Sequence, residues 1–177
     1  KIIAAAPDSE AIAAELGVID NIHVVPAFAG LGAPHWDPDA RGAILGLSRD
    51  TGVAEIVTAT LQSVAYQTRD LMLAMRDDGL DVELLRVDGG MVANDWFLGF
   101  LADMLGMPVE RPRVMETTSL GAAYLAGRQA GVYGSREEFA ALWQRDSRVE
   151  PRVSAREREA LLRHWHDAVE RRLPGDK

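Results

Sequence analysis

The sequence predicts an α/β domain whose sheet is connected by helical crossovers. Two observations point to this fold class. After residue 50, helix-like and strand-like segments alternate along the chain, and the strand-like segment at 83–88 runs into two glycines followed by a further helix. A β-α-β-α order of this kind is typical of a sheet with helical crossovers. The length of 177 residues favours one hydrophobic core over two.

One helix and two short strands are predicted before residue 50. Residues 8–16 read as a short helix that Gly17 closes. The segment 22–28, "IHVVPAF", is extended, and its proline limits it to an edge or a strand end. A second short strand is predicted at 43–48. The stretch 30–42 between the strands is rich in Gly, Pro and Asp and is predicted to be a loop.

The clearest helix follows directly. Thr51 is predicted as its N-cap, and Gly79 is predicted to close it in the C′ position. Apolar residues recur there at three- and four-residue steps, which predicts a buried face. These residues are Val53, Ile56, Val57, Leu61, Val64, Leu71, Met72 and Met75.

The next elements form the predicted strand–turn–helix core. The strand at 83–88 ends at the glycine pair, a helix runs from about 94 to 105, and a short strand occupies 108–112. A helix at 117–131 has a face of small residues, which suits close packing. We expect the side of this helix that carries Gly121, Ala122 and Ala123 to lie against the sheet or a neighbouring helix.

Two more helices are predicted near the C-terminus, over about 136–173. Ser135 with Glu138, and Ser154 with Glu157, match the capping box, so helices begin near 136 and 155. The last helix is amphipathic. Its inward residues are predicted to be Leu161, Leu162, Trp165 and Val169.

Composition excludes several classes of protein. The net charge of −8 argues against a general binder of nucleic acids or of anionic membranes, because both need a basic face. There are no cysteines, which excludes disulfides and thiolate metal sites and suits a cytoplasmic location. No apolar stretch reaches the roughly 18 residues of a membrane span. Since the first residue is Lys1, we expect the chain to be part of a longer polypeptide.

The stretch "LLRVDGGMVAN" at 84–94 holds the candidate binding site. A strand, two glycines and a helix can place backbone N–H groups against a phosphate or a ribose, and the helix N-terminus favours anions. On local sequence alone, a tight turn without a ligand is the favoured interpretation of Gly89 and Gly90, because glycine is the default residue at such turns. Asn94 is either a ligand contact or the N-cap of its helix. Asp88 is expected to brace the turn by hydrogen bonds.

Other motifs fail. The segment "GLGAPH" at 30–35 has His35 where a dinucleotide-binding motif needs its third glycine. The segment "DPDARG" at 37–42 has Arg41 at a ligand position of a calcium loop. His164 and His166 are two residues apart, so they cannot form a metal pair on one helix face, and they read as solvated residues. We therefore predict no metal-binding residue in this chain.

Several motifs occur in the order found in one family. The stretch "GAILGLSRDTGVAEIVTATLQ" at 42–62 resembles the signature of the FGGY carbohydrate kinases. The segments "VPAFAGLGAPHWDPDARG" at 25–42, "LRVDGGMVAN" at 85–94 and "VERPRVMETTSLGAAYLAG" at 109–127 are similar to family members that phosphorylate glycerol. The resemblance extends to about residue 133. Gln62, where the family commonly has an acid, and Ala29, where Thr is frequent, are mild departures.

The resemblance implies an actin-like ATPase domain with a ribonuclease-H-like core. A kinase of this family has two such domains with ATP and Mg²⁺ between them, and residues 1–177 resemble most of the second domain, with its first strands missing. In the family, the second glycine of the pair approaches the nucleotide and the Asn reaches toward the adenosine. Carried over, these residues are Gly90 and Asn94, with Gly89 as the turn partner.

The resemblance also implies what lies elsewhere. The family's catalytic Asp and its polyol-binding residues belong to upstream segments, and no Gly-Asp-Gln stretch occurs here. We therefore assign no catalytic residue in this chain. The implied activity is phosphorylation of glycerol by ATP, in a polypeptide with an N-terminal partner domain and an expected homo-oligomeric state. Two alternatives remain: a family member acting on a pentose or pentulose, and a non-catalytic actin-like nucleotide-binding module.

Overall fold

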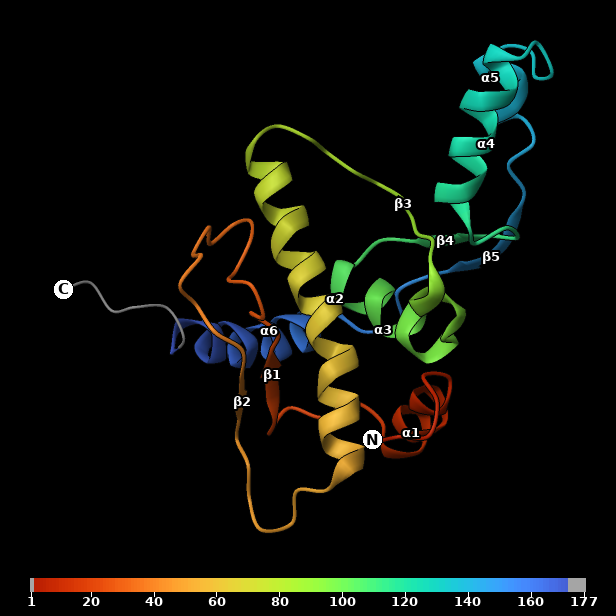
Figure 1. The fold of residues 1–177 in the computed structure, drawn as a ribbon. Coiled ribbons are helices and arrows are strands. Elements are labelled where there is room, and N and C mark those ends of the chain that lie inside the picture. The colour runs from red at the N-terminus through yellow and green to blue at the C-terminus, as the bar shows by residue number, and fades with distance from the viewer. Residues whose placement is uncertain (1, 172–177) are drawn as a thin grey trace.

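The computed structural model describes residues 2–171. It contains two small sheets and a set of helices around one main core (Figure 1). The elements are α1 (Asp8–Leu16), β1 (His23–Val25), β2 (Ala43–Leu45), α2 (Val53–Asp77), β3 (Leu85–Arg86), the 3₁₀ turn η1 (Gly90–Ala93), α3 (Asp95–Leu105), β4 (Val109–Pro112), α4 (Thr117–Gln129), α5 (Arg136–Ala140), β5 (Arg145–Val149) and α6 (Ala155–Glu170).

The crossover predicted after residue 80 is present. Strands β3 and β4 are parallel, with Leu85 opposite Val109, and α3 connects them. Strand β5 pairs antiparallel with β4 and completes the order β3-β4-β5. Strands β1 and β2 form a separate antiparallel pair in which Val24 lies opposite Ile44. The mixed α/β class is therefore confirmed at the level of individual strand pairs.

The core lies where α2, α3 and α6 meet. Tyr66 of α2 packs edge-on against Phe100 of α3 and stacks on Trp165 of α6, with ring centroids 5.4 Å apart in both pairs. All three rings are buried. Helix α3 has an apolar residue or Gly at nearly every position, and it is almost completely buried. It runs from Asp95 to Leu105 between the caps Asn94 and Gly106, close to the predicted range 94–105.

The structure corrects several local predictions. Gly52, not Thr51, is the N-cap of α2, and its N–H donates to Glu55 Oε2 at 2.8 Å. The Thr51 hydroxyl instead accepts from the N–H of Ser48 at 2.9 Å. On α2, Val53 and Leu71 are exposed rather than inward. The predicted inward face of α2 therefore holds only in part.

The C-terminal prediction missed a strand. The segment Arg145–Val149 pairs with β4, although its sequence has no run of apolar residues. Both capping boxes are confirmed, because Ser135 and Ser154 accept from the N–H groups of Glu138 and Glu157. Residues 172–173 of the predicted last helix lie outside the described residues.

The packing predicted for α4 is wrong in this structure. Figure 1 shows α4 and α5 standing away from α2, α3 and α6. Ala122 and Ala123 are exposed, and a Cβ added at Gly121 would meet nothing within 4 Å. Tyr124 is the one buried residue of α4, and it stacks on Phe139 of α5 with ring centroids 4.1 Å apart. The small-residue face therefore stays open instead of packing against the sheet.

Candidate functional site

The glycine pair forms an open turn between β3 and α3. Gly89 has φ +89°, a left-handed conformation that glycine adopts without strain. A Cβ built on Gly89 or on Gly90 would meet no atom within 4 Å. The protein itself therefore does not need the space above the turn. The positive φ of Gly89 explains why that position is glycine. Neither backbone conformation nor packing within the chain explains why position 90 is also glycine.

Two backbone N–H donors of this turn have no acceptor among the described residues. The N–H of Gly89 is used inside the fold, donating to the carbonyl of Met115 at 3.1 Å. Neither Gly90 nor Met91 donates its N–H to an acceptor within residues 2–171. Gly90 is exposed, and Met91 has 44% of its surface accessible. The first turn of a helix leaves such donors unpaired, and an anion or a polar group can satisfy them.

Arg111 of β4 holds the turn in place. Its Nη1 donates to the carbonyl of Val92 and to Asp95 Oδ1, each at 2.8 Å. On the other side of the guanidinium, Nε donates to Asp146 Oδ2 at 2.9 Å. Burial alone would lower the pKa of Arg111, but the hydrogen bonds that it donates to the carboxylates of Asp146 and Asp95 outweigh burial and raise that pKa. One side chain thus joins the turn, α3 and β5.

Asn94 caps α3 and contacts α1. Its Oδ1 accepts from the N–H of Phe97 at 2.8 Å, which is the N-cap bond predicted from sequence. Its Nδ2 lies 3.5 Å from the hydroxyl of Ser9. Next to it, the N–H of Asp95 donates to Glu10 Oε1 at 3.0 Å. The cap interpretation of Asn94 is confirmed, and the side chain is buried against α1 in this structure.

Sequence reasoning assigned the wrong brace to the turn. Asp88 is exposed, and its carboxylate makes no hydrogen bond with any described residue. The bracing contacts come instead from Met115 and Arg111, which follow the turn by more than 20 residues. The alternation of β4 could have indicated that Arg111 lies on one face of a strand. Its partners depend on how β4 and β5 pair, and the sequence does not contain that information.

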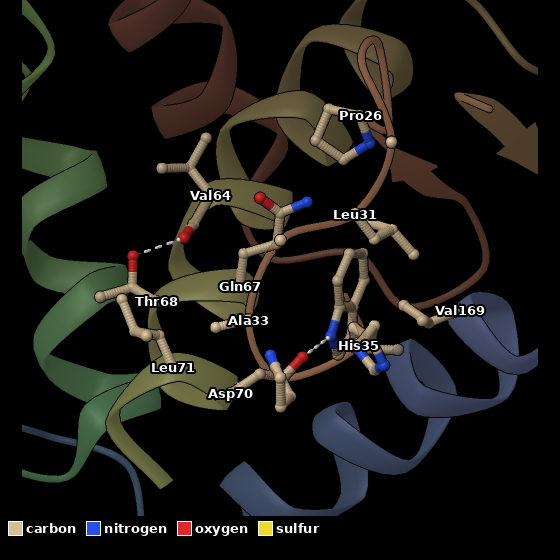
Figure 2. A pocket seen from close by; sticks show the side chains of 14 residues that line it. Pro26, Leu31, Ala33, His35, Val64, Gln67, Thr68, Asp70, Leu71 and Val169 are labelled. Atoms are coloured by element: carbon tan, nitrogen blue, oxygen red, sulfur yellow. Dashed lines mark hydrogen bonds between the residues drawn. The ribbon is translucent and has the colours of Figure 1, made fainter. Parts of the chain in front are cut away.

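A second concave site lies on the other side of α2 (Figure 2). This pocket of about 280 Å³ is bounded by the loop from Gly30 to His35, by α2 and by α6. Asp70 is buried at its wall and accepts from Trp165 Nε1 at 2.7 Å. His166 Nε2 lies 2.8 Å from the same carboxylate. His166 is therefore not the merely solvated residue that its spacing indicated.

The departure at Gln62 has a structural explanation. Gln62 is buried, its Oε1 accepts from the N–H of Ile19 at 3.0 Å, and its Nε2 donates to the Ile19 carbonyl at 2.7 Å. It also donates to the Tyr66 hydroxyl at 3.1 Å. Burial is the main cause that raises the pKa of Tyr66, to about 12. The amide thus satisfies an irregular backbone segment, a role that needs a donor and an acceptor on one side chain.

Across the described part of the chain, no three His, Asp or Glu side chains are grouped so that they could hold a metal ion. Among those same residues, no helix has both the length and the apolar character needed to cross a membrane.

Comparison with known proteins identifies the family. Residues 3–130 match the C-terminal domain of the FGGY family of carbohydrate kinases. Glycerol kinase from Ectopseudomonas mendocina is 59% identical over 172 residues, covering 97% of this chain and 35% of that protein. Glycerol kinase 1 from Pseudomonas aeruginosa is 54% identical over 171 residues, with 97% and 35% covered. The chain thus spans about 35% of the length of these curated relatives.

Solved structures of the same family share the fold of this chain. The crystal structure of Plasmodium falciparum glycerol kinase with ADP matches with a TM-score of 0.84 and 31% identity, covering 99% of this chain and 35% of that one. A xylulose kinase from Rhodospirillum rubrum matches with a TM-score of 0.75, 23% identity and coverage of 93% and 33%, which shows likeness of fold. These matches confirm the predicted actin-like fold class. The chain belongs to the FGGY family of carbohydrate kinases and corresponds to its C-terminal domain.

Proposed function

We propose that the polypeptide carrying this chain is a glycerol kinase, which transfers the γ-phosphoryl group of ATP to a primary hydroxyl of glycerol. The observation that carries the proposal is sequence identity to proteins of known name. Curated relatives that are 52–59% identical over nearly the whole chain are named glycerol kinase. Structures of family members named for other sugars share the fold at only 21–24% identity.

This chain is proposed to supply part of the nucleotide-binding side. The Plasmodium falciparum relative, whose structure is described with ADP, is 31% identical and shares the fold. In the present structure, the turn at Gly89 and Gly90 leaves open space and two unpaired N–H groups. That geometry fits the close approach of a nucleotide to the backbone. Asn94 lies at the end of the same turn, and we propose that it faces the adenosine while it caps α3.

The chemistry assigned to these residues is binding and orientation. ATP supplies the transferable phosphoryl group, and the general base is proposed to come from the N-terminal domain of the same polypeptide. We propose that the open amides of Gly90 and Met91 donate to the nucleotide, while Arg111 holds the next residue of the turn through the carbonyl of Val92. Positioning of this kind contributes much of the rate in phosphoryl transfer. Mg²⁺ is proposed to bind through the nucleotide and the other domain.

Substrate competition in the intact polypeptide tests the proposal. Phosphorylation is measured with a coupled assay for ADP release, using glycerol, xylulose and ribulose as separate acceptors. The proposal expects the highest kcat/KM with glycerol. A higher kcat/KM with a pentulose would assign the chain to the alternative branch of the family. ADP binding with no turnover of any acceptor would instead support a non-catalytic nucleotide-binding module.

A further inference from the structure

Three arginines meet around the C-terminal end of α3. Arg69 and Arg76 come from α2 and Arg158 comes from α6, and all three line a pocket of about 400 Å³. Arg69 Nη1 donates to the carbonyl of Leu105 at 3.0 Å, and Arg158 Nη1 donates to the carbonyl of Asp103 at 3.2 Å. This pocket lies apart from the glycine turn, which is at the other end of α3.

The positive charge of this cluster is not balanced by an ion pair. Among residues 2–171, no carboxylate oxygen lies within 4.0 Å of Arg69, Arg76 or Arg158. The Nε atoms of Arg69 and Arg158 are covered by protein and have no acceptor there. Burial, followed by repulsion from Arg158, lowers the pKa of Arg69. Two half-buried guanidinium groups therefore repel each other, and neither forms an ion pair within residues 2–171.

Capping of α3 explains only part of this arrangement. Cations and hydrogen-bond donors are favoured at a helix C-terminus, and each of two arginines satisfies one carbonyl there. A guanidinium group has five N–H donors in a planar fork, so most of the donors of Arg69 and Arg158 remain unused. Arg76 makes no hydrogen bond to any described residue, yet it lines the same pocket. Helix capping therefore does not account for a third arginine.

Acidic residues lie near the arginines, and a bound anion must overcome their repulsion. Asp81 and Glu83 line the exposed rim of the pocket, and Glu159 acts on Arg69 through its charge. These carboxylates oppose anion binding, although their exposure to solvent screens them. A carboxylate offers only two acceptor oxygens to three guanidinium groups. A phosphoryl group offers three, and these match the paired donors of a guanidinium.

The rest of the pocket wall is apolar. Met72, Leu80 and Met107 face it, and its volume of about 400 Å³ exceeds what a single phosphate group fills. The structure assigns this pocket as a binding site for a phosphate monoester dianion whose ester group is apolar, with Arg69, Arg76 and Arg158 around the phosphoryl group. The assignment does not depend on the proposed kinase activity.

Calorimetric titration of the intact polypeptide tests the site, with ADP present to occupy the nucleotide site. The probes are phenyl phosphate, inorganic phosphate and benzyl alcohol. We expect phenyl phosphate to bind more tightly than inorganic phosphate, because only the ester reaches the apolar wall, and benzyl alcohol not to bind. Arg76→Gln and Arg158→Gln should each weaken phenyl phosphate binding by about ten-fold or more, as loss of a charge-assisted hydrogen bond does.

Matched variants exclude a general charge effect. Arg163→Gln removes a charge from the exposed side of α6 and should leave binding unchanged, while Glu83→Gln should tighten it. If Arg158→Gln unfolds the protein, Arg76→Gln decides, because Arg76 is exposed and holds no helix carbonyl. Wild-type affinity in Arg76→Gln, or an equal loss in Arg163→Gln, would overturn the assignment. Benzyl alcohol binding as tightly as phenyl phosphate would do the same.

Discussion

The buried carboxylate of Asp70 accepts a hydrogen bond from Trp165 Nε1 at 2.7 Å, although the two residues are 95 positions apart. Asp70 belongs to α2, the longest helix, and Trp165 to α6, the last one. The same carboxylate lies 2.8 Å from His166 Nε2. Two polar contacts therefore attach the end of the described chain to the centre of the fold.

Loss of the indole donor should cost stability. Trp165→Phe keeps a ring that can stack on Tyr66 but leaves the Asp70 carboxylate with one donor fewer. An unsatisfied buried acceptor costs about 1–3 kcal/mol, so the melting temperature of the intact polypeptide should fall clearly. Trp96→Phe is the control, since Trp96 stacks on Phe100 and its N–H has no partner in residues 2–171. An equal loss in both variants would contradict the role of the hydrogen bond.

The contact between His166 and Asp70 should stabilise the protein only at lower pH. The hydrogen bond to Asp70 raises the pKa of His166, against the opposing effect of burial. A raised folded-state pKa gives stability that is fully present below the ordinary value of about 6.5 and is lost as the pH rises through the folded value. His166 is partly exposed, so the effect should stay below about 1 kcal/mol.

His166→Gln tests this dependence. The gap in melting temperature between wild type and His166→Gln should shrink between about pH 6 and about pH 9. His164→Gln serves as the control, because His164 Nδ1 lies 3.9 Å from the exposed carboxylate of Asp20. A gap that is constant or grows with pH would mean that the pair does not act through protonation of His166.

A branched side chain at Gly90 should block the nucleotide without unfolding the protein. A Cβ at this position meets nothing within 4 Å, so Gly90→Val should fit the ligand-free fold. If the backbone of Gly90 contacts the nucleotide, the KM for ATP should rise strongly while the KM for glycerol changes little. Steady-state kinetics of the intact polypeptide decide this. An unchanged KM for ATP would reduce the glycine pair to a turn without a ligand.

Asn94→Asp separates capping from binding. Asp caps a helix as well as Asn does, so the bond from the N–H of Phe97 should survive, and the melting temperature should fall only by what the 3.5 Å contact of Nδ2 with Ser9 contributes. A new negative charge near the phosphates should raise the KM for ATP, more mildly than Gly90→Val does. If the KM for ATP stays the same, Asn94 acts only as the cap that the structure shows.

Because the backbone packs closely around Gly46, an alanine there should destabilise the protein more than an alanine at Gly79. Both glycines have left-handed φ, +85° and +91°. A Cβ at Gly46 would collide with the carbonyl oxygen of Asn21, whereas one at Gly79 meets nothing within 4 Å. Gly79→Ala should therefore cost only the conformational strain, about 1–2 kcal/mol, and Gly46→Ala about 1–3 kcal/mol more. Equal losses on chemical denaturation would show that the collision is relieved elsewhere.

The 177-residue chain alone should self-associate. Strand β3 lies at the edge of its sheet, with no partner on its outer side among the described residues. Leu125 and Leu142, on and near the projecting helices α4 and α5, are 67% and 65% exposed. Unpaired edges and exposed apolar side chains favour association between copies. Light scattering should show oligomers that Leu125→Lys weakens more than Leu47→Lys, and a compact monomer at high concentration would contradict this.

Local signals explain why some elements were predictable. Asn94 and Gly106 mark both ends of α3, and the capping boxes at Ser135 and Ser154 mark two helix starts, because caps depend on residues within one turn. Strand β5 escaped prediction because its residues are mostly polar and it exists through pairing with β4.

Contacts between distant segments were not readable from the sequence. The open face at Gly121 was predicted as packed because small residues permit close packing but do not supply a partner. Likewise, the partners of Asp70 lie 95 or more positions away along the chain. For the candidate site, sequence patterns located the turn and its cap, whereas the supporting contact from Arg111 depends on strand pairing.

The contacts of Arg111 affect how a mutational scan would separate ligand-binding residues from structural ones. Its guanidinium holds the carbonyl of Val92 and the side chains of Asp95 and Asp146, and it lies on the inner side of the turn. Replacing it would loosen the glycine turn and reduce turnover even if ATP never touches the arginine. A mutational scan scored by growth alone would therefore count Arg111 among the ligand contacts. Scoring the same library for protein abundance as well would identify Arg111 as a structural residue, and the proposed nucleotide site predicts that Gly90 variants lose growth without losing abundance.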